Sequence, residues 1–500
     1  MRARRWAARL ALGLWLAGRV AVWAGGGPAG VVVVYDPNDI RSLTMANAYQ
    51  QARGIPERNL FPYAFPEGFT RHTAWDLVYA LRGLLAERGL EDQLQALALA
   101  AYTPLDSAQT TGSALSLHSF LYLSPAYSHA SIPTYVMANN PAYPSSGPTA
   151  EAFQAPAPAG TQALNAYTEY GGKRVWPVSA LGYPGRAGNS LGDILRYIGE
   201  ARAADGTRPE GTIYWPLNKN IRSTTRQSQV GPVTAVWAAR GIRYAVHGTE
   251  DLNGSETTGA NWVFNRPDVI GGVVGAANLN PRAGNRYLPG AWVDHLTSFG
   301  GRLDDYDGFY SYQSDAADWL RAGVHGSAGT MEEPGAVASK FPHPHIHTHF
   351  RSGASLSEGF WQSIQLPAQI LCLGDPLLQP HARFPVVTIL TPAAEAEVSG
   401  VIHLQAQAVP AAGQTLAPEW DLFLDGRRVA GAADWVTPVA DGFLLDTTAW
   451  SDGWHELRVT AYNADSVRTQ GEAVRSLRVN NHGQALTLTG PETVHPEMRA

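Results

Sequence analysis

PGAWVDHLTSFGG (289–301), WLRAGVHGSAGTMEEP (319–334), SLSEGFWQSI (355–364) and AQILCLGDPLLQP (368–380) follow one another in this chain. The last block is an apolar run that ends in Gly-Asp-Pro. Such a run predicts a buried strand that delivers a carboxylate, here that of Asp375, to the carboxyl edge of a sheet. Open α/β folds place their sites at that edge. The stretch therefore predicts an α/β fold with a site at the edge of its sheet.

Alternating strand and helix patterns precede this stretch. GVVVVYD (30–36) is a β-branched run typical of a strand that is covered on both faces of a parallel sheet. Helical patterns at 43–53, 73–89, 190–203 and 233–241 alternate with strand patterns at 59–65, 94–102, 176–183, 211–217 and 242–248. The alternation predicts a doubly wound, mostly parallel sheet over residues 30–383. Residues 103–170, rich in Pro, Ser, Ala and Tyr without a clear period, predict an insertion rather than a core element.

The two ends of the chain have different patterns. MRARR and the mostly apolar stretch that follows it are typical of a cleaved secretory signal over residues 1–24, because Arg9 and Arg19 leave an apolar core too short to span a bilayer. The sequence therefore predicts a secreted protein without a transmembrane segment in its mature chain. Period-two alternation over 384–481 predicts an all-β sandwich, and residues 482–500 predict a flexible tail.

The order of the blocks resembles the closing half of caspase-like domains of the gingipain type. In those domains a nucleophile-bearing strand is followed by a Gly-Ala-rich strand, a helix with Ser-Leu-x-Glu and a final Gly-Asp-Pro strand. VVVVYDPNDIRSLTMANAYQQARGIPERNL (31–60) and GTIYWPLNKNIRSTTR (211–226) extend the similarity to an uncharacterised family of secreted bacterial proteins. The tail resembles the immunoglobulin-like modules of secreted bacterial proteins. The resemblance implies a caspase-like α/β domain followed by an immunoglobulin-like sandwich, and it implies no particular reaction.

Cysteine peptidases of the caspase-like fold need a thiolate at the end of one strand and a His-Gly at the end of the preceding strand. This chain departs from both requirements, because Ser298 stands at the nucleophile position and the preceding strand, 268–278, has no histidine. His295 precedes Ser298 by three residues, and His247 ends a neighbouring strand. A serine needs a base and an orienting group within hydrogen-bond reach. Ser298 and His295 are therefore either remnants of a lost site or the nucleophile and base of a hydrolase.

Acidic side chains offer a second candidate site. Glu332 follows a Gly-rich strand and Asp375 follows the final strand, so both are expected at the edge of the sheet. Converging carboxylates would bind a cation or serve as the acid/base pair of a glycoside hydrolase. The alternative is that Asp375 caps its own turn and Glu332 pairs with a basic side chain.

Four histidines alternate in FPHPHIHTHF (341–350): His343, His345, His347 and His349. If the segment is extended, the imidazoles point to one side, where two of them would share a Zn or Cu ion. Pro342 and Pro344 instead indicate a surface loop without a metal.

Composition narrows the classes of function. The formal charge of -6, from 37 Lys and Arg against 43 Asp and Glu, gives no basic excess for nucleic acid. Cys372, the single cysteine, lies in an apolar strand pattern and is expected to behave as a small core hydrophobe. Trp435, Trp450 and Trp454 are candidates for a sugar-binding face.

Without the cysteine nucleophile, the sequence favours a secreted or cell-surface binding or scaffold protein with an extracellular polymer or protein partner. The alternative is a hydrolase, peptidase-like or glycoside-cleaving, that uses Ser298 with His295 or His247, or the edge formed by Glu332 and Asp375.

Overall fold

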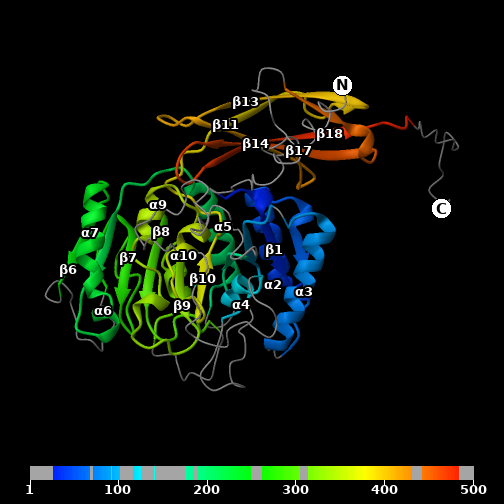
Figure 1. The fold of residues 1–500 in the computed structure, drawn as a ribbon. Coiled ribbons are helices and arrows are strands. Elements are labelled where there is room, and N and C mark those ends of the chain that lie inside the picture. Colours follow the sequence, from blue (N-terminus) through cyan, green and yellow to red (C-terminus); the bar gives the residue numbers. More distant parts are fainter. Residues whose placement is uncertain are drawn as a thin grey trace, which may run out of the picture.

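A computed structural model describes residues 26–67, 71–91, 93–101, 116–125, 140, 175–184, 188–248, 262–303, 313–430 and 442–483. The expected signal, Trp435 and residues 484–500 of the expected tail lie outside these residues. An α/β domain and a β-sandwich that lies across one edge of its sheet make up the described chain (Figure 1). The expected class, an α/β domain followed by a β domain, is confirmed.

A ten-stranded sheet forms the centre of the α/β domain. Its strands are β1 (Val31–Tyr35), β2 (Leu60–Pro62), β3 (Ala96–Leu99), β4 (Val178–Ala180), β5 (Thr212–Pro216), β6 (Tyr244–His247), β7 (Val269–Gly275), β8 (Tyr287–Leu296), β9 (Gly326–Thr330) and β10 (Ile370–Gly374). Their order is β2-β1-β3-β4-β10-β9-β8-β7-β5-β6.

The pairing in this sheet is parallel within two groups of strands. Strands β1 to β4 form one group and β5 to β9 the other. In both groups the first strand lies between the second and the third, so the same order occurs twice. Strand β10 separates the groups. It is antiparallel to β9 and meets β4 at one residue pair, Leu373 with Ala180. The expected mostly parallel sheet is confirmed.

Helices cover both faces of this sheet (Figure 1). They are α2 (Ile40–Arg53), α3 (Arg71–Arg88), α4 (Leu117–Leu123), α5 (Leu191–Ala204), α6 (Ile221–Thr224), α7 (Val230–Ala239), α8 (Ala316–Arg321), α9 (Ile346–Arg351) and α10 (Leu356–Gln362). On β8, Trp292 packs against Phe350 and Phe360 of α9 and α10, whereas His295 packs against Trp319 of α8. Because side chains alternate along a strand, α8 lies on the opposite face from α9 and α10. Of the helices described, none has the length and apolarity to cross a bilayer.

Glycines in β7 let neighbouring groups approach the sheet closely. A Cβ atom at Gly271 would lie 2.5 Å from Cε1 of His347, and one at Gly275 would lie 2.4 Å from the backbone of Arg222. A larger residue at either position would displace α9 or α6, because both contacts are far shorter than van der Waals distance. Strand β7 therefore decides how closely the histidine helix and the Arg222 helix approach the sheet.

Helix α4 corrects the expectation that residues 103–170 contain no core element. Its residues are all buried, and Ser116 caps it by accepting a hydrogen bond from the backbone of Ser119. Because every face of LHSFLYL is covered, the segment has no amphipathic period that would mark it as a helix. Most of the remaining expected insertion lies outside the described residues.

The second domain is a sandwich of a three-stranded and a five-stranded sheet. Its strands are β11 (Val386–Thr391), β12 (Glu397–Val398), β13 (Val401–Val409), β14 (Leu416–Leu424), β15 (Arg427–Ala430), β16 (Phe443–Asp446), β17 (Gly453–Asn463) and β18 (Gln470–Val479). Ile389 and Leu404 of one sheet meet Leu457 and Leu477 of the other in its core. The period-two alternation predicted this core.

Backbone-directed polar contacts fix the sandwich to the α/β domain. Gln93, which precedes β3, donates to the carbonyl of Gly426 and accepts from the backbone N–H of Arg428. The buried Arg458 of β17 donates to the carbonyl of Gly54, just after α2, at 2.7 Å. The sandwich therefore sits against the edge at which β1 and β3 begin.

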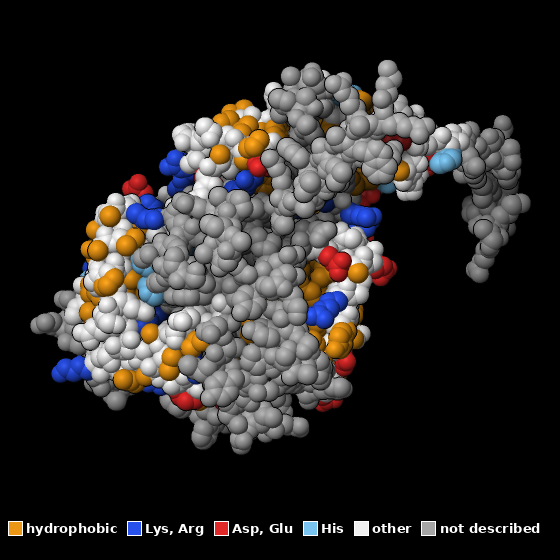
Figure 2. Space-filling model, in the orientation of Figure 1, with side chains coloured by type: hydrophobic (Ala, Val, Ile, Leu, Met, Phe, Trp, Pro, Cys, Tyr) orange, Lys and Arg blue, Asp and Glu red, His pale blue; other side chains and the backbone are white. Residues whose placement is uncertain are grey.

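Charged side chains of both signs are interspersed over the described part of the face drawn in Figure 2. In the sandwich, Trp454 is 61% exposed, whereas Trp450 packs against the core beside His455. These two tryptophans therefore do not share one exposed face.

Candidate functional site

Ser298 lies just beyond the end of β8 and is held by its neighbours. Its carbonyl accepts a hydrogen bond from Thr330 Oγ1 at 2.9 Å, and its N–H donates to Gln313 Oε1 at 2.9 Å. Gln313 Oε1 also accepts from the N–H of Phe299 at 3.2 Å and from the hydroxyl of Thr297. These bonds leave Ser298 buried and fixed.

An arginine, not a histidine, contacts the hydroxyl of Ser298. Arg222 donates from Nη2 to Ser298 Oγ at 3.0 Å. Arg222 reaches this position because α6 packs directly against Gly275, beyond the last residue pair of β5 and β7, Tyr214 with Gly272. Asn218, just after β5, donates from Nδ2 to the carbonyl of Gly275 at 3.0 Å. Arg222 and Asn218 therefore both contact Gly275 at the switch point between β5 and β7, and the guanidinium of Arg222 extends to the residue beyond the end of β8.

His295 does not act on Ser298. Its Nδ1 accepts from Trp319 Nε1 at 3.3 Å, and its Nε2 lies 2.9 Å from the carbonyl of Ala276. Because an indole N–H only donates and a carbonyl only accepts, the proton is on Nε2. Burial lowers the pKa of His295 to about 4, so the ring is neutral. Because His295 and Ser298 are three residues apart, their side chains point to opposite sides of an extended chain.

His247 is also distant from Ser298. It ends β6 at the edge of the sheet and stacks on Tyr214, with ring centroids 5.7 Å apart. Strands β5 and β7 lie between β6 and β8, so β6 and β8 are three strand spacings apart, or ~14 Å. The structure therefore assembles no nucleophile and base from Ser298, His295 and His247.

Glu332 and Asp375 do not converge, contrary to the expectation of one carboxylate edge. Because β9 and β10 are antiparallel, Gly374 lies opposite Gly326, at the start of β9, whereas Glu332 follows its end. The distance along β9 from Gly326 to Glu332 is ~20 Å. Glu332 instead forms an ion pair with Arg302. The direction of β10 decides this outcome, and the order of blocks in the sequence does not reveal it.

Asp375 is a structural residue in a fully buried network. Its Oδ1 accepts from Tyr49 at 2.8 Å and from the N–H of Leu377 at 2.9 Å. Its Oδ2 accepts from Arg53 Nε at 2.6 Å, and Arg53 also pairs with Asp205. Asp375 therefore caps its own turn and joins the end of β10 to α2.

The second half of the histidine run is helical, which contradicts the extended geometry assumed for a metal site. Helix α9 begins at Ile346, so His347 and His349, two positions apart within it, point in different directions, and the run does not present four imidazoles on one side. His343 and His345 stack face to face with centroids 5.0 Å apart, and His347 packs against Trp237. Burial lowers the pKa values of His343, His347 and His349 to about 3 and that of His345 to about 4. No group of three or more His, Cys, Asp or Glu side chains suited to a metal ion occurs among the described residues.

Cys372 is buried in β10, as expected for a core hydrophobe. Burial raises the pKa of its thiol to about 12, so the thiol is protonated. Its Sγ lies 3.5 Å from the hydroxyl of Ser179.

The sequence did not single out Arg222 and Gln313. Within the described structure, neither Arg222 Nε nor Gln313 Nε2 has a hydrogen-bond partner, although both atoms are buried. The amide of Gln313 cannot be flipped, because its oxygen accepts from two backbone N–H groups. The hydroxyl of Ser298 accepts from Arg222 and keeps its own proton available. Donors without acceptors therefore surround Ser298. The sequence Asn-Lys-Asn-Ile-Arg after β5 does not indicate that Arg222 contacts Ser298, because the two residues are brought together by the tertiary structure.

Comparisons with known proteins identify no family. No family model and no curated protein matches the chain. Fibronectin type III-like modules of CbhA from Clostridium thermocellum match at 17% identity and a TM-score of 0.17, over 27% of this chain and 64% of theirs. CopC from Methylosinus trichosporium OB3b matches at 15% identity and a TM-score of 0.15, over 20% of this chain and 99% of its own. The endo-β-1,4-mannanase of Thermotoga petrophila matches at 10% identity and a TM-score of 0.17, over 58% of this chain and 72% of its own. This chain thus spans less than two thirds of the CbhA modules, and similarity at these TM-scores carries no argument about function.

Proposed function

We propose that the protein is a secreted or cell-surface binding protein that holds a carboxylate-bearing ligand beside Ser298. The observation that carries the proposal is the set of donors around Ser298. Its hydroxyl contacts the guanidinium of Arg222 and no imidazole, and buried N–H groups of Arg222 and Gln313 have no acceptor within the described structure. Leaving a buried donor without an acceptor costs about 1–3 kcal/mol, which a bound acceptor recovers.

Charge selects the ligand class. Arg222 forms no ion pair with a carboxylate among the described residues, whereas the neighbouring Arg226 pairs with Asp294. One uncompensated guanidinium matches one negative charge, and a carboxylate accepts several hydrogen bonds in the planar geometry that arginine favours. An acidic extracellular polymer or an acidic protein segment has this chemistry.

The fold supports a particular origin for the site. We infer that the α/β domain is a degenerate caspase-like domain, because Ser298 follows the fourth strand of a group ordered second, first, third, fourth. We also infer that the sandwich is an immunoglobulin-like module. Secretion is inferred from residues 1–24. The alternative, a hydrolase, lacks support at Ser298, since both nitrogens of His295 are engaged elsewhere.

Calorimetric titration with N-acetylglycine tests the proposal, with N-acetylglycinamide as the neutral control. Arg222→Met should weaken N-acetylglycine binding at least about tenfold, because a hydrogen bond to a charged group contributes about 1.5–3 kcal/mol. Arg478→Met, which removes an exposed arginine of the sandwich, should change nothing. Binding that tolerates Arg222→Met would contradict the site.

Substrate profiling separates binding from hydrolysis. Peptide and glycoside libraries should show no turnover that depends on Ser298. Turnover by the wild type that Ser298→Ala abolishes would establish the hydrolase and refute a purely binding role.

A further inference from the structure

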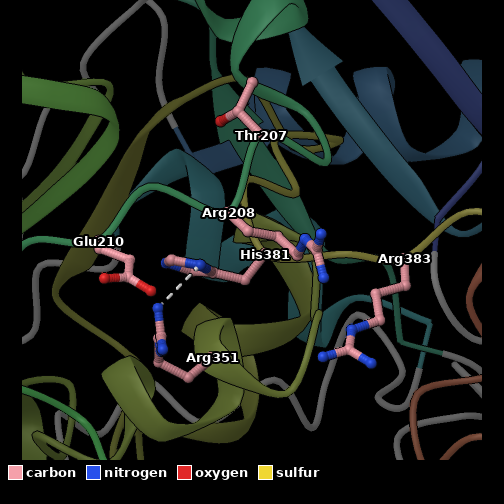
Figure 3. Close-up of a pocket in the computed structure, with 6 residues that line it drawn as sticks. All are labelled: Thr207, Arg208, Glu210, Arg351, His381 and Arg383. Carbon is pink, nitrogen blue, oxygen red and sulfur yellow. Dashed lines mark hydrogen bonds between the residues drawn. The ribbon is translucent and has the colours of Figure 1, made fainter. Parts of the chain in front are cut away.

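A pocket of ≈ 340 Å³ opens where the α/β domain meets the linker to the sandwich (Figure 3). Thr207, Arg208 and Glu210 line it from the connection between α5 and β5, Arg351 from the end of α9, and His381 and Arg383 from the linker. In Figure 3, Glu210 and Arg351 lie on one side of His381, and Arg383 lies on the other. The pocket thus draws its side chains from separate segments of the chain, and it lies at the edge where β5 begins, whereas Ser298 lies at the opposite edge, where β8 ends.

The pocket has a surplus of positive charge. Three arginines face one glutamate, which leaves a surplus of two charges in a chain whose formal net charge is -6. His381 adds no charge, because burial and the adjacent Arg351 lower its pKa to about 3. Its Nδ1 accepts from Arg351 at 3.3 Å.

The guanidinium groups of these arginines make few hydrogen bonds to described residues. The guanidinium of Arg208 makes no hydrogen bond or ion pair to any described residue, and that of Arg383 donates to one carbonyl, of Ala412, at 3.2 Å. Burial lowers the pKa of Arg351, and Arg243 lowers it further against the opposing effect of Glu210. An anion bound beside Arg351 would oppose this shift, because it favours the charged form of the guanidinium.

Backbone contacts hold Arg208 in position. Its N–H donates to the carbonyl of Pro380 at 2.8 Å, and the N–H of Gly206 donates to that of Gln379 at 3.1 Å. Arg208 has a φ of 50°, which is uncommon for a residue other than glycine and costs energy. The linker therefore fixes a strained backbone whose side chain lines the pocket.

We propose that this pocket binds a phosphate monoester group. Such a group carries about -1.5 to -2 charge at pH 7, which matches the surplus of two, and it offers three acceptor oxygens. Guanidinium forks bind phosphate oxygens in pairs, and the side chains around the pocket supply three forks. Because Arg208 and Arg351 belong to the α/β domain and Arg383 to the linker, a bound phosphate would tie the linker to the α/β domain.

Calorimetric titration of the full-length protein with methyl phosphate tests the proposal. Arg208→Met should weaken binding about tenfold or more, the value of one charge-assisted contact. Glu210→Gln should strengthen it, because it removes the one carboxylate among the described residues that line the pocket. Methyl sulfate, with a single charge, should bind about tenfold more weakly. Arg478→Met serves as the matched control.

Arg208 and Glu210 are exposed, so neither substitution should disturb folding. The test therefore does not require a substitution of Arg351. The proposal is overturned if methyl phosphate gives no saturable heat, if Arg208→Met binds like the wild type, or if methyl sulfate binds equally well. N-acetylglycine binding should be unchanged in Arg208→Met, so failure here is distinguishable from failure of the site beside Ser298.

Discussion

Replacing Asp375 by asparagine should destabilise the α/β domain without removing its binding site. The substitution keeps the side-chain shape but removes the charge that Arg53 and Tyr49 contact. The asparagine would also place an amide N–H₂ group, which can only donate, opposite groups that donate hydrogen bonds to Asp375. Arg53 keeps Asp205 as a partner, so its charge is not left wholly alone.

The expected cost is about 3 kcal/mol, the lower end of the range for breaking a buried ion pair, because Asp205 remains. Unfolding entropy of about 2.1 cal/mol/K per residue over a domain of roughly 350 residues gives ~0.7 kcal/mol/K, so the midpoint should fall by about 4 °C. Glu332→Gln is the matched control. Its ion pair with Arg302 is partly exposed and should contribute less than about 1 kcal/mol, or near 1 °C.

Scanning calorimetry measures both midpoints, and N-acetylglycine titration of the same samples measures the site. Equal shifts for Asp375→Asn and Glu332→Gln would refute the assignment of Asp375 to the fold. So would loss of N-acetylglycine binding by Asp375→Asn at an unchanged midpoint, since that result would return Asp375 to the site.

Two further predictions concern the buried histidines. His347 and His295 have folded pKa values lowered by burial to about 3 and about 4 from 6.5, so the unfolded chain takes up their protons first. Stability should therefore be complete above pH ~6.5 and fall as the pH drops toward these values, by about 2 kcal/mol for each ring at pH 5; a midpoint that does not change between pH 8 and pH 5 would contradict this. Copper or zinc titration should show no site that is lost when His345 and His347 are both changed to Ala, because His347 packs against Trp237 whereas His345 stacks on His343; a site lost in that variant would restore the metal proposal.

Local pattern was enough to predict many of the elements. GVVVVYD predicted β1, and the apolar run before Gly-Asp-Pro predicted β10, because burial on both faces leaves a continuous apolar run in the sequence. Strict alternation predicted the sandwich, because each of its sheets has one buried face and one solvated face, so apolar and polar residues alternate along the strands. Helix α4 escaped prediction because it is buried all round, and the histidine run was misread because a spacing of two suits a strand but does not require one.

The sequence by itself determined where the chain forms strands, which residues end them and that Cys372 is a core residue, since these depend on neighbours along the chain. Only the tertiary structure decided which ends meet. The antiparallel direction of β10 separates Glu332 from Asp375, and the approach of α6 to Gly275 brings Arg222 to Ser298. The arginine pocket likewise joins segments more than 140 residues apart. Sites of this kind depend on contacts between distant segments, and no local period in the sequence records them.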